Sequence, residues 1–313
     1  SGSTLETGAT NASTTFSGVI SGDGGLRKVG TGTLTLTTGN TYSGGTVIAG
    51  GTISISKSDR LGDASGALTL DGGVLQVTDT ILHELTRDIV LGANGGGFDI
   101  VEADNTFSVL QSFSGTGALN KAGAGTLVLK GTNSYSGATT VSDGTLRAGA
   151  AGAFSSNSAF TVASGATLDL AGFDQSIASL AGAGTVTLGS GTLTAGSNNS
   201  STTFSGSISG SGGLDKTGTG TLTLTGTNSY TGSTKVSGGK LVVNGSITSN
   251  VTLDGGTLGG SGTVGTTVVN AGATVAPGNS IGTLSVSGNV AFASGSTYQV
   301  EVNAAGQSDR IVA

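Results

Sequence analysis

The chain has 313 residues, of which 60 are Gly, one is Pro and none is Cys, Met or Trp. Its 12 Lys and Arg against 18 Asp and Glu give a net charge of −6, and the basic residues never cluster, which argues against a nucleic-acid partner. No apolar run is long enough to form a transmembrane helix, and a single His with no Cys makes a zinc site improbable. Neither Met nor a signal peptide opens the chain, so we expect a fragment of a longer protein.

In chain order, the first feature is a segment that recurs twice. Residues 15–56, 112–150 and 203–244 are copies, and their equivalent tyrosines are Tyr42, Tyr135 and Tyr230. A fixed internal period indicates a chain built by stacking repeated units.

A shorter period lies inside each copy. Leucines alternate with threonine, as at Leu34 and Leu36, and apolar residues return 19 positions later, as at Ile53. Alternation places side chains on opposite faces of a strand, and a return after roughly 20 residues fits one coil of a parallel β-helix. We therefore predict an all-β fold, a right-handed parallel β-helix of about 15 coils with Leu, Ile and Val inside and Thr, Ser and Lys outside. Helices and extensive disorder are disfavoured, because Gly interrupts every helical pattern and apolar residues recur in register.

Between the first and second copies lie the candidates for chemistry. His83 beside Glu84 could form half of a catalytic pair, but a solvent-facing role in an irregular coil is the simpler interpretation. Three close acids suggest calcium, although the nine-residue pattern of calcium-binding β-rolls is absent. These acids are Asp99, Glu102 and Asp104.

Glycine runs at 22–25 and 95–97 lack the Gly-Lys-Ser/Thr sequence of a phosphate-binding loop, so we interpret them as turns. We predict no catalytic, cofactor-binding or metal-ligating residue and no cofactor.

Each copy also carries an asparagine two residues before its tyrosine: Asn40, Asn133 and Asn228. A ladder of ligand-binding amides is conceivable, but stacked turn asparagines that bond to the backbone are the stronger expectation. The tyrosines could stack on sugars, yet their equal positions favour packing at one corner of the coil.

The last segment changes character at Pro277, the only proline, which we expect in a turn rather than in a central strand. The residues that follow alternate in shorter runs, with turns expected at 287–289 and 294–296. We interpret residues 276–313 as a terminal cap of shorter strands that protects the open edge of the β-helix and folds first.

The three copies resemble a known sequence repeat. Residues 24–53, 117–146 and 212–241, such as GGLRKVGTGTLTLTTGNTYSGGTVIAGGTI, are similar to the passenger-associated transport repeat of bacterial autotransporters, and residues 276–313 resemble the autochaperone region that precedes the membrane barrel. The second copy departs from the pattern with a shorter first turn, GTGALN.

This resemblance implies a β-helical passenger over residues 1–275, an autochaperone-like cap over 276–313 and, in the full-length protein, a linked outer-membrane β-barrel. It implies a rod on the surface of a Gram-negative bacterium, from a family whose passengers act mostly as adhesins, autoaggregation factors, toxins or proteases. Because the 12 basic and 18 acidic side chains are scattered over the chain, we predict that this rod is non-catalytic. The rod would adhere to a host surface protein, matrix protein or glycan, or would self-associate and cause autoaggregation. One alternative is an inert stalk for an upstream protease or esterase, and a weaker one is a β-helix enzyme that acts on polysaccharides.

Overall fold

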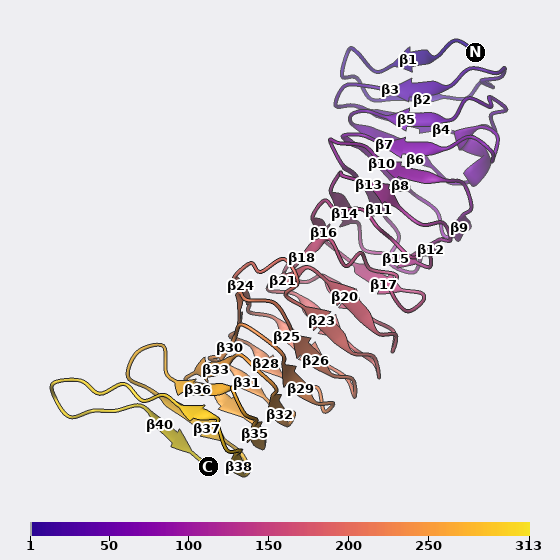
Figure 1. Ribbon diagram of the computed structural model, residues 1–313. Helices are drawn as coiled ribbons and strands as arrows, with labels where there is room; N and C mark the ends of the chain where they lie inside the picture. Colours follow the sequence, from indigo (N-terminus) through magenta and orange to yellow (C-terminus); the bar gives the residue numbers. More distant parts are fainter. Residues whose placement is uncertain (1) are drawn as a thin grey trace. The chain divides into compact units, whose positions relative to one another are not determined.

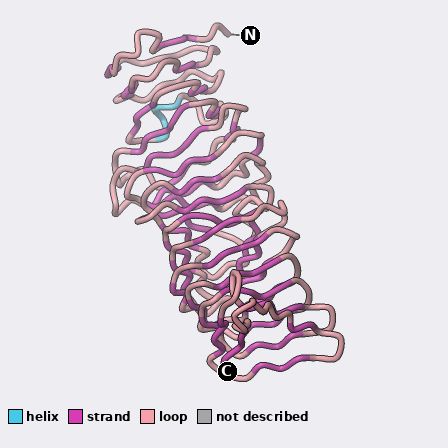
Figure 2. The backbone as a smooth tube through the Cα atoms, turned by 90° about the vertical axis from the view of Figure 1, so that its left-hand side faces the viewer, coloured by secondary structure: helices cyan, strands magenta, loops and turns pink. Residues whose placement is uncertain are grey.

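Short parallel strands make up nearly all of the regular structure. The computed structural model describes residues 2–313, in which strands alternate with turns and the one helical segment is a single 3-10 turn, η1 (Ser58–Leu61) (Figures 1 and 2). The chain divides into two compact units, Ser1–Ser158 and Ala159–Ala313. We describe each unit by itself.

The first unit is a parallel β-helix with three sheets, each of which receives a strand from successive coils. The first sheet contains β1 (Leu5–Thr7), β3 (Leu26–Lys28), β5 (Thr46–Ile48), β7 (Leu68–Leu70), β10 (Ile89–Leu91) and β13 (Ser114–Gly115). The second contains β2 (Thr14–Phe16), β4 (Thr33–Leu36), β6 (Thr52–Ile55), β8 (Gly73–Val77), β11 (Gly96–Ile100), β14 (Leu119–Ala122) and β16 (Thr139–Val141). The third contains β9 (Glu84–Leu85), β12 (Thr106–Val109), β15 (Thr126–Leu129) and β17 (Thr145–Ala148).

The second unit repeats this architecture with four sheets. The first contains β18 (Ala159–Val162), β21 (Ser179–Gly182), β24 (Thr202–Phe204), β27 (Thr221–Leu224), β30 (Lys240–Val243), β33 (Thr257–Gly260), β36 (Thr274–Pro277) and β39 (Thr297–Tyr298). The second contains β19 (Thr167–Asp169), β22 (Thr185–Thr187) and β25 (Ser207–Ser209). The third contains β20 (Gln175–Ile177), β23 (Leu193–Ala195), β26 (Leu214–Lys216), β29 (Thr234–Val236), β32 (Val251–Leu253), β35 (Thr267–Val269) and β38 (Val290–Phe292). The fourth contains β28 (Thr227–Asn228), β31 (Ser246–Ile247), β34 (Thr263–Val264), β37 (Thr283–Val286) and β40 (Arg310–Val312).

The register confirms the 19-residue period. Leu34 of β4 lies opposite Ile53 of β6, and the other two copies pair in the same way. Those pairs are Leu127 with Leu146 and Leu222 with Leu241. All named strand pairs within the units are parallel, and crossovers between parallel strands of one sheet are almost always right-handed, so the predicted right-handed coil stays our expectation.

The core follows from the alternation along the strands. In β4 the leucines are buried and the threonines between them are half-exposed, which leaves apolar side chains stacked inside the coil. Rings add to this stack in the first unit, where Phe98 and Phe113 lie nearly parallel with centroids 5.8 Å apart. Offset contacts between rings add about 0.5–1.5 kcal/mol each beyond the buried area.

Glycine columns explain much of the glycine content. In the second unit Gly206, Gly226, Gly245 and Gly262 occupy one corner of successive coils, and a Cβ added to any of them would lie within 2.0 Å of a carbonyl oxygen in the preceding coil. Only a residue without a side chain lets these turns stack at the β spacing of about 4.8 Å.

The C-terminal segment extends the sheets of the second unit with short strands, and its turns fall at 287–289 and 293–296, close to the expected positions. The prediction for Pro277 is wrong: it is the last residue of β36 and lies opposite Gly260 of β33. The ladder tolerates this proline because pairing with β39 on the other side ends at Val275, so no partner there needs its missing N–H.

Candidate functional site: buried polar clamps and outer ladders

Each repeated segment places a lysine inside the coil. The ammonium group donates to three backbone carbonyls, two just after the lysine in its own coil and one in the coil that follows. For Lys28 these are Val29 O at 2.7 Å, Gly30 O at 3.2 Å and Gly50 O at 3.4 Å. For Lys121 they are Ala122 O, Gly123 O and Asp143 O at 2.7–3.1 Å, and for Lys216 they are Thr217 O, Gly218 O and Gly238 O at 2.6–3.2 Å. We call these three sites the lysine cages.

The cages correct the expectation that lysine faces outward. Lys28, Lys121 and Lys216 are at most 1% exposed. In β3 the pattern is Leu26 buried, Arg27 half-exposed and Lys28 buried, so the lysine shares the inner face of the leucine. Burial lowers the pKa of all three amines, and lowers that of Lys121 to about 8. Three carbonyl acceptors match the three donors of an ammonium group and compensate part of this desolvation.

The asparagines form a second clamp, which confirms the backbone-bonding interpretation. The Asn40 side-chain oxygen accepts from Ile20 N at 2.8 Å in the preceding coil, and its Nδ2 donates to Arg60 O at 2.7 Å in the following coil. Asn133 and Asn228 repeat this arrangement. One amide therefore bonds to the coil on either side of its own, and because these asparagines are at most 6% exposed, they are not accessible to a ligand.

The tyrosines form the third clamp and are buried, as the packing interpretation predicts. The Tyr42 hydroxyl lies 2.6 Å from the Thr46 hydroxyl, and Tyr135 with Thr139 and Tyr230 with Thr234 repeat the contact. Each threonine also bonds to the following coil, through Leu61 O in the first copy and through Ser158 and Ser249 in the others. With rings at most 1% exposed, these tyrosines cannot stack on sugars.

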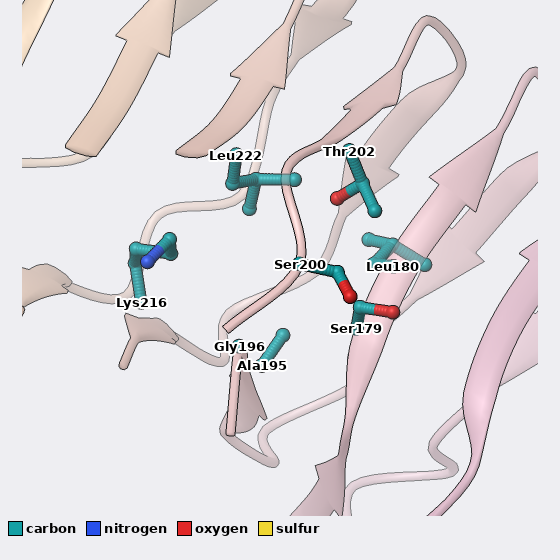
Figure 3. Close-up of a pocket in the computed structure, with 8 residues that line it drawn as sticks. All are labelled: Ser179, Leu180, Ala195, Gly196, Ser200, Thr202, Lys216 and Leu222. Atoms are coloured by element: carbon teal, nitrogen blue, oxygen red, sulfur yellow. The ribbon is translucent and has the colours of Figure 1, made fainter. Parts of the chain in front are cut away.

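The space around the Lys216 cage is too small for a ligand. Lys216 borders a cavity of about 10 Å³, together with Gly196, Leu222 and the hydroxyl-bearing Ser179 and Ser200 (Figure 3). A cavity needs roughly 10–15 Å³ to hold even one water molecule. The Lys216 cage is therefore a structural clamp with no room for a ligand.

Arg87 occupies a related cage outside the repeats. Its guanidinium donates to five backbone carbonyls, those of Ser58, Leu61, Gly62, Asp63 and Gly66, and the residue is 3% exposed. Burial lowers the pKa of this guanidinium from a very high ordinary value. The two terminal amino groups of the planar guanidinium spread their N–H donors over this ring of acceptors more widely than a lysine ammonium could.

The outward face of the long sheet in each unit consists mainly of small uncharged side chains. In the first unit one column of paired residues, the first outer ladder, is Thr33, Thr52, Val74, Gly97, Asn120 and Thr140. In the second unit the equivalent column, the second outer ladder, is Thr221, Lys240, Thr257, Thr274 and Thr297. Parallel pairing repeats these groups at about 4.8 Å from coil to coil, so each ladder is a regular array of hydroxyl, amide and methyl groups.

The sequence-predicted candidates for chemistry are not assembled into a site. His83 and Glu84 are exposed at the start of β9, and the His83 carbonyl accepts from Ser108 N at 2.7 Å. Asp99 accepts from Gln76 Nε2 at 2.8 Å, whereas Glu102 and Asp104 are exposed. No group of three or more potential metal ligands occurs among residues 2–313. Gly96 and Gly97 lie in strand β11 rather than in a loop that could hold phosphate.

The clamps coincide with a known sequence repeat. Residues 26–55, 119–148 and 214–243 match the passenger-associated-transport-repeat. Over 259 residues, 77% of this chain, the sequence is 37% identical to "Adhesin BmaC autotransporter" of Brucella suis biovar 1 (strain 1330). The chain belongs to the autotransporter passengers.

The passenger spans 8% of the length of this curated relative. No solved structure matches the passenger. Within residues 2–313, no helix is long and apolar enough to cross a membrane. Autotransporter passengers are displayed on the surface of Gram-negative bacteria and are anchored at the outer membrane, which is the location that we assign to this segment.

Sequence reasoning missed the lysine and arginine cages because it assigned basic side chains to solvent. For the lysines a signal was present, since the sequence Leu-x-Lys places leucine and lysine on the same face of a strand in every copy. For Arg87 no signal was available, because its cage is built by the turn at 58–66, a segment more than 20 residues away.

Proposed function

We propose that this passenger segment is a non-catalytic adhesive surface that binds through its outer ladders to host surface proteins, matrix proteins or glycans, or to another passenger. The observation that carries the proposal is the composition of the two ladders, in which Lys240 is the single charged residue. A neutral array can approach a second flat array without charge repulsion, and many weak contacts along it add up to useful avidity. The relative that carries the name adhesin supports the same function.

The bonding of the polar groups inside the coil supports a non-catalytic role. The strongly desolvated basic groups donate to backbone carbonyls, and the buried tyrosines bond to threonines, so their polar atoms are already engaged. A polysaccharide-acting enzyme needs carboxylates grouped over one groove. The exposed acids of this chain are instead bonded to neighbouring side chains in several places, as at Asp254 with Lys235. We therefore propose binding rather than catalysis.

Beads coated with the purified chain test adhesion directly. We expect them to clump with one another or to bind immobilised matrix proteins or glycans. A variant with Thr33→Glu and Thr140→Glu on the first outer ladder should lose most of this binding, because carboxylates introduce repulsion and break the array. The matched control carries Thr69→Glu and Ser114→Glu on the neighbouring sheet of β7 and β13, and should bind like the wild type. Equal loss in both variants would contradict the role of the ladder.

The alternative is an inert stalk that presents an upstream protease or esterase. Its support is the density of clamps inside the repeats, which suits a spacer as well as an adhesin. Coated beads that neither clump nor bind any matrix protein or glycan would favour the stalk.

We also propose that residues 276–313 promote folding of the passenger. Their strands β37 to β40 lie at the end of the sheets of the second unit and provide edges on which preceding coils can stack. Removal of residues 281–313 should slow refolding of the remaining chain severalfold. Unchanged refolding kinetics in the truncated chain would contradict this role.

A further inference from the structure

The alternation of leucine and threonine leaves one ambiguity in how the coils stack. A slip of one residue between β4 and β6 would turn leucines outward and is strongly disfavoured. A slip of two residues would keep the leucines inside the coil, because Leu34 and Leu36 repeat with the same period as Ile53 and Ile55. Apolar packing by itself therefore allows coils displaced by two residues, about 6.6 Å along the strand.

The lysine cage depends on the position along the strand. Lys28 in β3 reaches Gly50 O of the following coil, and the two other copies use the carbonyl at the same offset, 22 residues after the lysine. A displacement of about 6.6 Å would take this acceptor out of hydrogen-bonding range and leave an ammonium group buried with fewer partners.

A glycine completes the cage from the following coil. Gly51 follows Gly50 and has a φ of +60°, and a Cβ placed on it would lie 2.8 Å from Lys28 Nζ. A Cβ placed on Gly239, which has a φ of +63°, would likewise lie 2.8 Å from Lys216 Nζ. In the second copy Gly144 has a φ of +59° and follows Asp143, whose carbonyl accepts from Lys121. The coil that accepts the lysine thus carries a left-handed glycine turn at one fixed position.

We propose that each buried lysine sets the stacking register of its repeat on the following coil, by excluding the two-residue slip that the leucine–threonine alternation permits. Buried polar groups fix the register of coiled coils by the same physical means, a penalty on every arrangement that leaves them unpaired. The lysine is a specificity-determining residue of the fold, and its acceptor in the next coil is the carbonyl of the residue just before the left-handed glycine. This inference does not depend on adhesion.

The native chain has no cysteine, so spin labels can be placed at chosen sites alone. Thr33→Cys and Thr52→Cys are direct partners on β4 and β6, and labels there should show strong dipolar coupling after refolding at pH 7. With Lys28→Met, which keeps an unbranched apolar side chain of similar length, we expect at least a fifth of the molecules to move to a second population in which the two labels are farther apart and their coupling is weaker. With Lys57→Met, which removes an exposed charge, we expect the single strongly coupled population of the parent.

A second variant keeps the lysine and blocks its cage. Gly51→Ala should produce the same second population, because the new Cβ would lie 2.3 Å from Gly32 O, 2.6 Å from Gly30 O and 2.8 Å from Lys28 Nζ, so the following coil could not close the cage in its native register. Its control is Gly152→Ala, which has a similar φ of +67° but open space around the added Cβ, and which should stay in register. A single strongly coupled population in both Lys28→Met and Gly51→Ala would overturn the proposal. So would failure of both variants to fold while their controls fold, since the cage would then supply stability alone.

Discussion

The Asp309 carboxylate accepts a hydrogen bond from Gly282 N at 2.9 Å, and its other oxygen accepts from Glu301 N at the same distance. Asp309 is 5% exposed and immediately precedes β40, which pairs with β37. One carboxylate therefore attaches the final strand both to the coil before it and to the loop that leads into it.

Replacing Asp309 with Ala should release this final strand. The loss of two backbone hydrogen bonds to a charged acceptor should lower the free energy of unfolding of the last coil by about 2–4 kcal/mol. Hydrogen exchange should accelerate at 283–286 and 310–312 and stay unchanged at 221–224. The exposed Glu301→Gln substitution serves as control, and equal exchange in the two variants would refute the attachment role of Asp309.

The coil-to-coil pairing of Leu34 with Ile53 could be predicted from the sequence because hydrophobic burial acts on every strand and leaves a regular period. The interior lysine could not be predicted by the rule that charged residues face water, because that rule ignores how many backbone carbonyls a stacked turn brings together. The cage carbonyl of Gly50 lies in another coil, so it becomes visible only when the coils are superimposed. The local alternation of side chains therefore predicts the fold, whereas the clamps depend on acceptors that lie far away in the sequence.

The asparagine clamp predicts a difference between two similar substitutions. In Asn228→Asp the side chain keeps an acceptor for Ile208 N but loses the donor to Gly226 O and Ser246 O, and brings a negative charge close to both carbonyls. We expect a loss of about 3–5 kcal/mol in the free energy of unfolding, against about 2 kcal/mol for Asn228→Ala. Urea unfolding followed by circular dichroism measures both. The exposed Asn94→Ala should change stability by less than about 0.5 kcal/mol. An aspartate variant as stable as the alanine variant would contradict the clamp geometry.

The glycine column predicts a purely steric penalty. A Cβ at residue 226 would lie 2.0 Å from Gly206 O, and the backbone there is not left-handed, so Gly226→Ala should destabilise the second unit by about 2–3 kcal/mol through forced separation of two coils. The comparison is Gly255→Ala, where the nearest atom is Ser237 O at 3.2 Å and a small shift relieves the contact. Thermal unfolding measures the difference, and equal midpoints for the two variants would exclude tight stacking at residue 226.

The pKa of Lys121 predicts how stability changes with pH. Burial lowers this pKa to about 8, below the ordinary 10.5 of the unfolded chain, so between these values the unfolded state binds more protons than the folded state. The contribution of Lys121 to the free energy of unfolding should therefore rise with pH from about 8 to 10.5, by up to about 3 kcal/mol. Burial raises the pKa of Tyr135, so unfolding exposes a group that ionises above pH 10 and opposes this gain. Subtracting the urea-unfolding profile of Lys121→Met from that of the wild type removes the tyrosine contribution, and a difference that stays flat between pH 8 and 9.5 would show that the Lys121 amine keeps its ordinary pKa in the folded chain.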